Sequence, residues 1–224
     1  MGFRIGSLIL YPQMVMIPLG AAFFLVIAYK RHSVSARSRR GLIAAVISSA
    51  VMAAAGALIL ADESDPHAIF GGQLSFAGYW GALIGACVWA LISRNPVAAA
   101  GNAVAPAVML GGAVARIGCL FAGCCRGASG ILLYHVWPLY DIAALLVALM
   151  LGVREERRRS SGSLLSFLIV YGFLRFFLEF IREARVTELG LTTGQLFAGA
   201  QVGVGVALVL AGKAKSAVVR NQDV

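Results

Sequence analysis

The chain has 224 residues, of which 60% are hydrophobic and 13% are charged, and its formal net charge is +9. A soluble domain carries about a quarter charged residues, so this chain is too poor in polar residues to cover a water-facing surface, and lipid must cover it instead. Its basic residues stand in short clusters at the ends of apolar runs. This pattern excludes nucleic acid as a partner and makes the charge a signal of membrane orientation.

Seven apolar runs are long enough to cross a bilayer, which takes about 20 residues. They lie at Leu8–Tyr29, Gly41–Ala61, Leu74–Ile92, Asn102–Phe121, Ile131–Val153, Ser163–Ile181 and Thr193–Gly212. The first run ends in charge and is too long for a cleavable signal peptide, so we interpret it as a transmembrane helix. The sequence predicts an all-α, polytopic integral membrane protein of about seven transmembrane helices, with residues 1–224 in a single domain.

Charge alternates between the loops. Cations cluster after the first, third, fifth and seventh runs, whereas the other loops carry far fewer of them. Cytoplasmic loops are rich in Lys and Arg, so we predict that the N-terminus lies outside and the C-terminus inside.

With this orientation, four predicted helices carry polar residues in one slab near the outer surface. These residues are Ser75, Arg116, Cys119, Cys124, Cys125, His135, Asp141, Tyr171, Arg175, Glu179 and Arg182. An ionisable side chain in a bilayer costs a few kcal/mol or more, and such residues usually face a bundle interior or a hydrated cavity. The sequence therefore predicts a functional site at the outer end of the bundle.

The two arginines within this slab differ in their neighbours. Arg175 and Glu179 stand four residues apart and can form an ion pair on one helix face. Arg116 has no acidic neighbour within one turn, so its partner must come from another helix or from a ligand. A planar guanidinium grips a phosphate with two parallel hydrogen bonds, and we favour that role for Arg116. For Arg175 both interpretations stay open, and His135 is either a general base or an interfacial cap.

Three cysteines cluster within seven residues at the predicted outer surface: Cys119, Cys124 and Cys125. A disulfide, a metal site with His135 and a reactive thiol are all compatible with them. Their spacing matches no standard zinc pattern, and we predict no metal. Cys119 shares a helix face with Arg116, whose charge favours the thiolate, so we predict that Cys119 is the reactive thiol. Cys87 reads as a small packing residue in the middle of a helix.

Several segments together resemble the prolipoprotein diacylglyceryl transferases. They are Gly71–Gly85, Ala115–Gly127, His135–Asp141, Tyr171–Glu183 and Gly194-Gln195, in the order and spacing of that family. Its members are seven-helix enzymes of the bacterial inner membrane that move diacylglyceryl from phosphatidylglycerol to a cysteine thiol. The resemblance implies the same location here. It implies that Arg116 and Arg175 are the essential arginines, with Glu179 and His135 as supporting polar residues.

Four positions depart from the family pattern. Ala77 stands for a histidine, Cys119 for an asparagine, Cys124 for an acidic residue and Leu19 for a tyrosine. The arginines of the pattern are retained, while part of the machinery for the acceptor is replaced by thiols.

We therefore expect a phospholipid-dependent transferase without a cofactor. It would move a diacylglyceryl or related lipid group from an anionic phospholipid to an acceptor protein or a small thiol. Arg116 and Arg175 would hold the headgroup and stabilise the departing glycerol phosphate, while His135 or Cys119 would supply a base or a nucleophile. The expected substrate-binding residues are Glu179, Tyr171, Ser75, Arg182, Asp141, Cys124 and Cys125.

Two other functions stay open. The chain could be a carrier that passes a soft metal or a thiol compound across the membrane through its outer cysteines. Such a path needs polar residues on the cytoplasmic side, where the sequence offers only Cys87 and small residues. The chain could also be an inactive relative that is kept for lipid binding.

Overall fold

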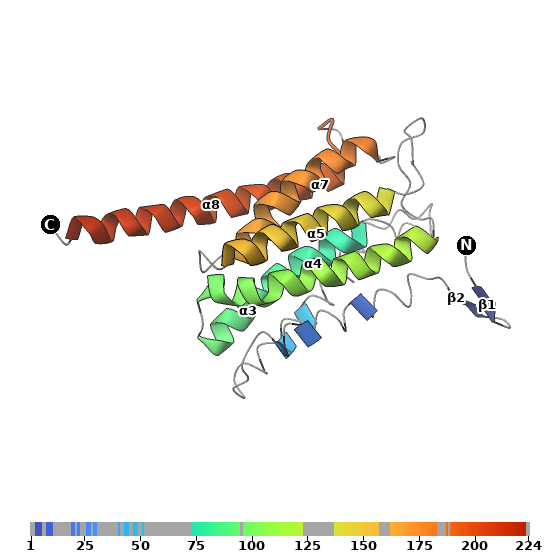
Figure 1. The fold of residues 1–224 in the computed structure, drawn as a ribbon, viewed down its shortest axis with the longest axis horizontal. Coiled ribbons are helices and arrows are strands. Elements are labelled where there is room, and N and C mark those ends of the chain that lie inside the picture. The colour runs from blue at the N-terminus through green and yellow to red at the C-terminus, as the bar shows by residue number, and fades with distance from the viewer. Residues whose placement is uncertain are drawn as a thin grey trace.

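The computed structural model is a bundle of helices preceded by a short β-hairpin (Figure 1). It describes residues 3–5, 8–10, scattered positions between 19 and 51, 73–94, 96–122, 137–156, 162–182, 187 and 189–222. Strand β1 (Phe3–Ile5) pairs antiparallel with strand β2 (Leu8–Leu10), and Ile5 lies opposite Leu8.

The hairpin corrects the predicted start of the first helix. The apolar run beginning at Leu8 was expected to be helical throughout, but Leu8–Leu10 is a strand, and the first described helical residue is Leu19. Only Gly6 and Ser7 separate the two strands, and two-residue connections that begin with Gly favour hairpins. Pairing with Phe3–Ile5 therefore overrides the apolar continuity of the run.

The third to seventh predicted helices are confirmed. They correspond to α3 (Gln73–Ser93), α4 (Val97–Ala122), α5 (Trp137–Glu156), a compound helix over residues 162–181, and α8 (Thr193–Gln222). Within the described residues, four segments are long and apolar enough to cross a membrane: Ala99–Phe121, Trp137–Glu156, Gly162–Ile181 and Thr193–Gly212. The first two predicted helices fall mostly outside the described residues.

Small residues let α4 pack closely against its neighbours. Ala100, Ala103 and Ala107 of α4 are buried, and α3 and α5 both pack on this helix. A Cβ added to Gly20 would lie 2.5 Å from the carbonyl oxygen of Gly111, so Gly20 also lies close against the α4 backbone. Such close approach through Gly and Ala is typical of helices that pack in membranes.

The compound helix consists of α6 (Gly162–Leu165), a π-helical segment η3 (Ser166–Tyr171), α7 (Gly172–Leu178) and a 3-10 turn η4 (Glu179–Ile181). A π-turn shifts the backbone hydrogen bonds from i+4 to i+5. Gln201 of α8 donates from Nε2 to the carbonyl of Phe167 in this segment, at 2.7 Å. Ser166 donates to the carbonyl of Ala148 at 2.6 Å.

The half of the bundle that holds the start of α4 and of the compound helix was expected to contain only Cys87 and small residues. It contains buried polar side chains as well. Besides Ser166, Asn102 is buried there and accepts a hydrogen bond from the backbone N–H of Leu164, at 2.8 Å. Buried backbone groups must be paired; Asn102 meets that need for an N–H in the first turn of the compound helix, and Ser166 links that helix to α5. They stabilise the start of the compound helix.

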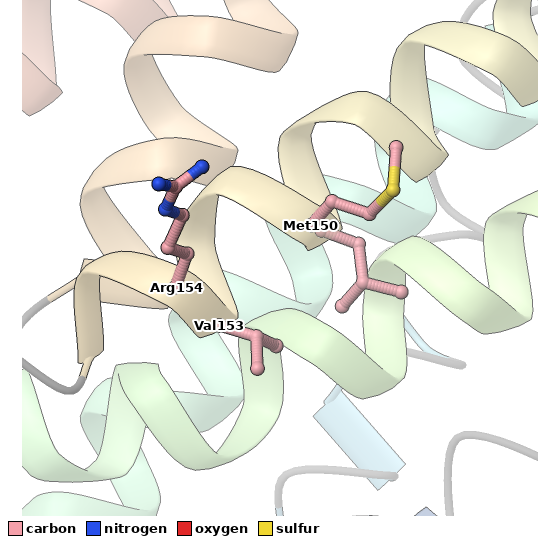
Figure 2. Close-up of a pocket in the computed structure, with 4 residues that line it drawn as sticks. Met150, Val153 and Arg154 are labelled. Atoms are coloured by element: carbon pink, nitrogen blue, oxygen red, sulfur yellow. The ribbon is translucent and has the colours of Figure 1, made fainter.

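The polar ends of four segments meet at one end of the bundle, on the right in Figure 1. These are the last turns of α4 and of η4, and the first turns of α5 and of α8. The opposite end of α5 carries a hollow of about 510 Å³, lined by Leu149, Met150, Val153 and Arg154 (Figure 2). The hollow therefore lies away from the clustered polar residues.

Candidate active site

Arg116 lies near the end of α4 and pairs with a carboxylate from another helix. Its Nε is 2.6 Å from Oδ2 of Asp141 in α5, and the two side chains are only 2% and 0% exposed. This confirms the first of the two partners expected for Arg116, a residue of a neighbouring helix. Charges buried this deeply must be paired to offset their loss of hydration, so the contact also joins α4 to α5.

Asp141 serves a second arginine as well. Nε of Arg175 in α7 lies 3.6 Å from Asp141 Oδ1. The hydroxyl of Tyr171 donates to the same oxygen at 3.2 Å. Arg175 also forms the predicted ion pair with Glu179, one turn further along the chain. Asp141 and Glu179 therefore flank Arg175 from two different segments.

Glu179 is held where η4 meets the first turn of α8. Nη1 of Arg182 donates to Glu179 Oε1 at 3.2 Å. A Cβ added to Gly194 would lie 2.5 Å from the same oxygen, so only glycine leaves room for the carboxylate there. The positive end of a helix dipole favours a nearby carboxylate.

The first turn of α8 is fixed by a capping box. The backbone N–H of Gln195 donates to Thr192 Oγ1 at 3.1 Å, and the backbone N–H of Thr192 donates to Gln195 Oε1 at 2.9 Å. Each side chain satisfies a backbone donor that a helix start leaves open. The turn that contacts Glu179 is therefore rigid.

Trp137, the first residue of α5, contacts all three of these arginines. The guanidinium carbons of Arg175, Arg182 and Arg116 lie 4.7, 5.1 and 5.4 Å from its ring centre. The indole is 1% exposed, and its N–H donates to the carbonyl of Leu178 at 3.1 Å. A guanidinium within about 6 Å of an indole centre is attracted by the ring quadrupole.

Two further aromatic rings fix Tyr171. Phe167 stacks on it with ring centres 5.6 Å apart, and Tyr79 of α3 meets it edge-on, also at 5.6 Å. All three rings are buried. The Tyr171 hydroxyl is therefore held toward Asp141 by packing on both sides.

The described residues of this cluster carry more positive than negative charge. Three guanidiniums, those of Arg116, Arg175 and Arg182, share the carboxylates of Asp141 and Glu179. Guanidinium groups present donors whose geometry matches a phosphate. The cluster is closed, because both Arg116 and Arg175 are buried.

Six predicted site residues thus meet in one cluster: Arg116, Asp141, Tyr171, Arg175, Glu179 and Arg182. Cys119 lies one turn beyond Arg116 on α4 and is half-buried. Ser75 lies in the first turn of α3. Three other predicted residues lie outside the described residues: Cys124, Cys125 and His135. Cys87 is exposed on α3, so its expected packing role is wrong: the residue points away from the core.

Three residues of the cluster received no individual role from the sequence, although all of them lie in segments that resemble the family: Trp137, Tyr79 and Gly194. Trp137 was overlooked because an aromatic residue at a helix start is typical of the membrane interface. Tyr79 follows the segment from Gly71 to Gly78, which contains no ionisable residue that would single it out. The role of Gly194 depends on tertiary contact with Glu179, although the Thr192–Gln195 spacing does signal a helix start.

Comparison with known proteins identifies the family of this chain. A sequence model of the family "prolipoprotein diacylglyceryl transferase" matches residues 2–211. Phosphatidylglycerol–prolipoprotein diacylglyceryl transferase 2 of Clostridium perfringens is 27% identical over 157 residues, which are 59% of this chain and 60% of that protein. The phosphatidylglycerol–prolipoprotein diacylglyceryl transferase of Dehalococcoides mccartyi is 27% identical over 153 residues, 59% of each chain. The chain thus aligns with about three fifths of these relatives' length. It belongs to the prolipoprotein diacylglyceryl transferase family.

Proposed function

We propose that this chain transfers a diacylglyceryl group from phosphatidylglycerol to a thiol, the sulfur of a prolipoprotein cysteine. The observation that carries the proposal is the closed cluster of three guanidiniums and two carboxylates, counted over the described residues, at one end of the bundle. Each guanidinium offers paired donors that match the oxygens of a phosphodiester headgroup. The names of the two relatives state the same donor and acceptor.

In the proposed reaction the thiol sulfur attacks the glyceryl carbon that bears the phosphate. A carbon–sulfur bond forms while the carbon–oxygen bond breaks, the electron pair leaves with glycerol phosphate, and the thiol proton passes to a base. Arg116 and Arg175 stabilise the charge that grows on the leaving phosphate, and Glu179 orients Arg175. His135 is the proposed base. Because both arginines are buried against carboxylates, the entering phosphate exchanges with carboxylate contacts.

Replacing each arginine by lysine tests this proposal. Lysine keeps the charge but loses the planar fork, so Arg116→Lys and Arg175→Lys should lower turnover of labelled phosphatidylglycerol by at least about tenfold, the loss of roughly one good hydrogen bond to a charge. Arg154→Lys is the matched control, since Arg154 is exposed at the opposite end of α5 (Figure 2). If both Arg116→Lys and Arg116→Ala turned over lipid at the wild-type rate, Arg116 would have no catalytic role and would serve only the structure.

Cys119 decides between one-step and two-step transfer. If its thiolate is the nucleophile, the lipid passes first to Cys119 and then to the acceptor. Cys119→Ser would then abolish turnover while phosphatidylglycerol still binds. Mass spectrometry of the protein incubated with phospholipid would detect a diacylglyceryl adduct on Cys119. An active sample without the adduct would establish direct transfer to the acceptor.

We further propose that the cluster faces the outer side of a bacterial inner membrane, with the N-terminus outside. The proposal rests on the alternation of cations between loops. Single cysteines introduced at positions 37 and 158 should react only with membrane-permeant reagents in intact cells, and those at positions 65 and 188 with impermeant ones. The reversed labelling pattern would place the cluster on the cytoplasmic side.

A further inference from the structure

Trp137 occupies the centre of the guanidinium cluster rather than its edge. None of the three guanidinium carbons lies farther than 5.4 Å from the centre of its ring. Arg116 comes from α4, whereas Arg175 lies in the compound helix and Arg182 directly follows it, so the indole contacts two segments that are far apart in the sequence. Its N–H bond to the Leu178 carbonyl, at 3.1 Å, fixes the ring against the segment that carries Arg175.

An aromatic ring at this point does what a carboxylate cannot. A carboxylate would attract the guanidiniums but would also cancel their charge. An indole attracts a cation through its quadrupole while it carries no net charge. It therefore lets like charges gather without adding a negative charge to those of Asp141 and Glu179, and the potential that remains is what an anionic ligand meets.

We propose that Trp137 is the positioning residue that sets the affinity of this site for an anionic headgroup over a zwitterionic one. The inference rests on the proposed function in that the ligand is a phospholipid phosphate. It does not depend on which acceptor receives the diacylglyceryl group, so it concerns headgroup binding and not the transfer step. Trp137 does not itself touch the phosphate. It positions Arg116, Arg175 and Arg182, which do.

Substitutions can separate this role from packing. Trp137→Phe keeps an aromatic face but loses the N–H donor to Leu178, whereas Trp137→Leu loses both and keeps an apolar side chain. Trp89→Leu is the matched control, since Trp89 is likewise 1% exposed but lies in α3 outside the cluster. The readout is the Kd of fluorescent phosphatidylglycerol and of phosphatidylcholine with the same acyl chains, in detergent micelles.

Trp137→Leu should weaken phosphatidylglycerol binding by about tenfold and leave phosphatidylcholine binding nearly unchanged, so that discrimination between the lipids falls. Trp137→Phe should retain part of the discrimination. Trp89→Leu should retain all of it, even where that variant is less stable than the wild type. A wild-type Kd and a wild-type lipid ratio in Trp137→Leu would overturn the proposal. An equal loss for both lipids would also overturn it, because that pattern reports packing alone.

Fluorinated tryptophans introduced at position 137 keep the test decisive if Trp137→Leu does not fold. Each added fluorine weakens the ring quadrupole with little change in shape and keeps the N–H. The logarithm of Kd for phosphatidylglycerol should then rise with the number of fluorines. A Kd that does not change with fluorine number would refute the proposal. Wild-type turnover is measured separately: an inactive wild type that still discriminates between the lipids through Trp137 would refute the transferase and uphold this inference.

Discussion

Replacing Asp141 by asparagine should cost this protein more stability than any other single isosteric change in the cluster. The substitution keeps the size of the side chain and an oxygen that can still accept from Tyr171, so the hydroxyl contact at 3.2 Å is largely retained. What is lost is the charge opposite Arg116, at 2.6 Å, and the weaker contact to Arg175, at 3.6 Å. Removing one partner of a buried ion pair costs about 3–5 kcal/mol.

The Arg116 contact should dominate that loss. Arg175 retains its ion pair with Glu179 when Asp141 is changed, and its contact with Asp141 is the longer of the two. Equilibrium unfolding in mixed detergent micelles measures the change in free energy. Tyr171→Phe is the matched control: it removes only one hydrogen bond to the same carboxylate and should cost about 1–2 kcal/mol.

A double replacement tests whether the loss comes from the pair. Two apolar residues in place of a buried ion pair are often neutral or stabilising. Arg116→Met combined with Asp141→Leu should therefore be more stable than either single variant, with a coupling energy of about 2 kcal/mol or more. Additive losses, or an Asp141→Asn cost below about 1 kcal/mol, would refute the view that this pair joins α4 to α5.

Two further changes test the supports of the cluster. Gln201→Leu removes the donor to the Phe167 carbonyl in the π-helical segment, and an unsatisfied buried carbonyl should lower the unfolding free energy by about 1–3 kcal/mol; a neutral effect would mean that the segment does not need this bond. Gly194→Ala places a Cβ against the Glu179 carboxylate and should reduce lipid turnover, whereas Gly199→Ala, with nothing within 4 Å of its Cβ, should not. Equal turnover in the two alanine variants would remove Glu179 from the proposed mechanism.

The sequence predicts well what a single helix determines. Arg175 and Glu179 were expected to pair because residues four apart share a helix face, and the ion pair is present. Apolar length likewise predicted the helices from α3 to α8, because a bilayer fixes how many apolar residues a crossing needs. These features follow from local geometry alone.

Tertiary features were harder to foresee. Asp141 was expected in the site, but its pairing with Arg116 depends on how α4 and α5 pack, which spacing along one helix does not determine. The π-helical segment accepts a hydrogen bond from Gln201, 34 positions from its partner Phe167. The hairpin at Phe3–Ile5 and Leu8–Leu10 had a local signal in Gly6-Ser7, but the continuous apolar run concealed it.

The first turn of α5 controls both the charge and the geometry of the cluster. Trp137 and Asp141 stand four residues apart, so they project from one face of the helix and reach the same two arginines, Arg116 and Arg175. Asp141 neutralises charge there, while Trp137 gathers charge without neutralising it. A second carboxylate at position 137 would add a negative charge beside the arginines and weaken their attraction for a phosphate. The combination of one acid and one indole lets the arginines be buried stably and still attract an anion.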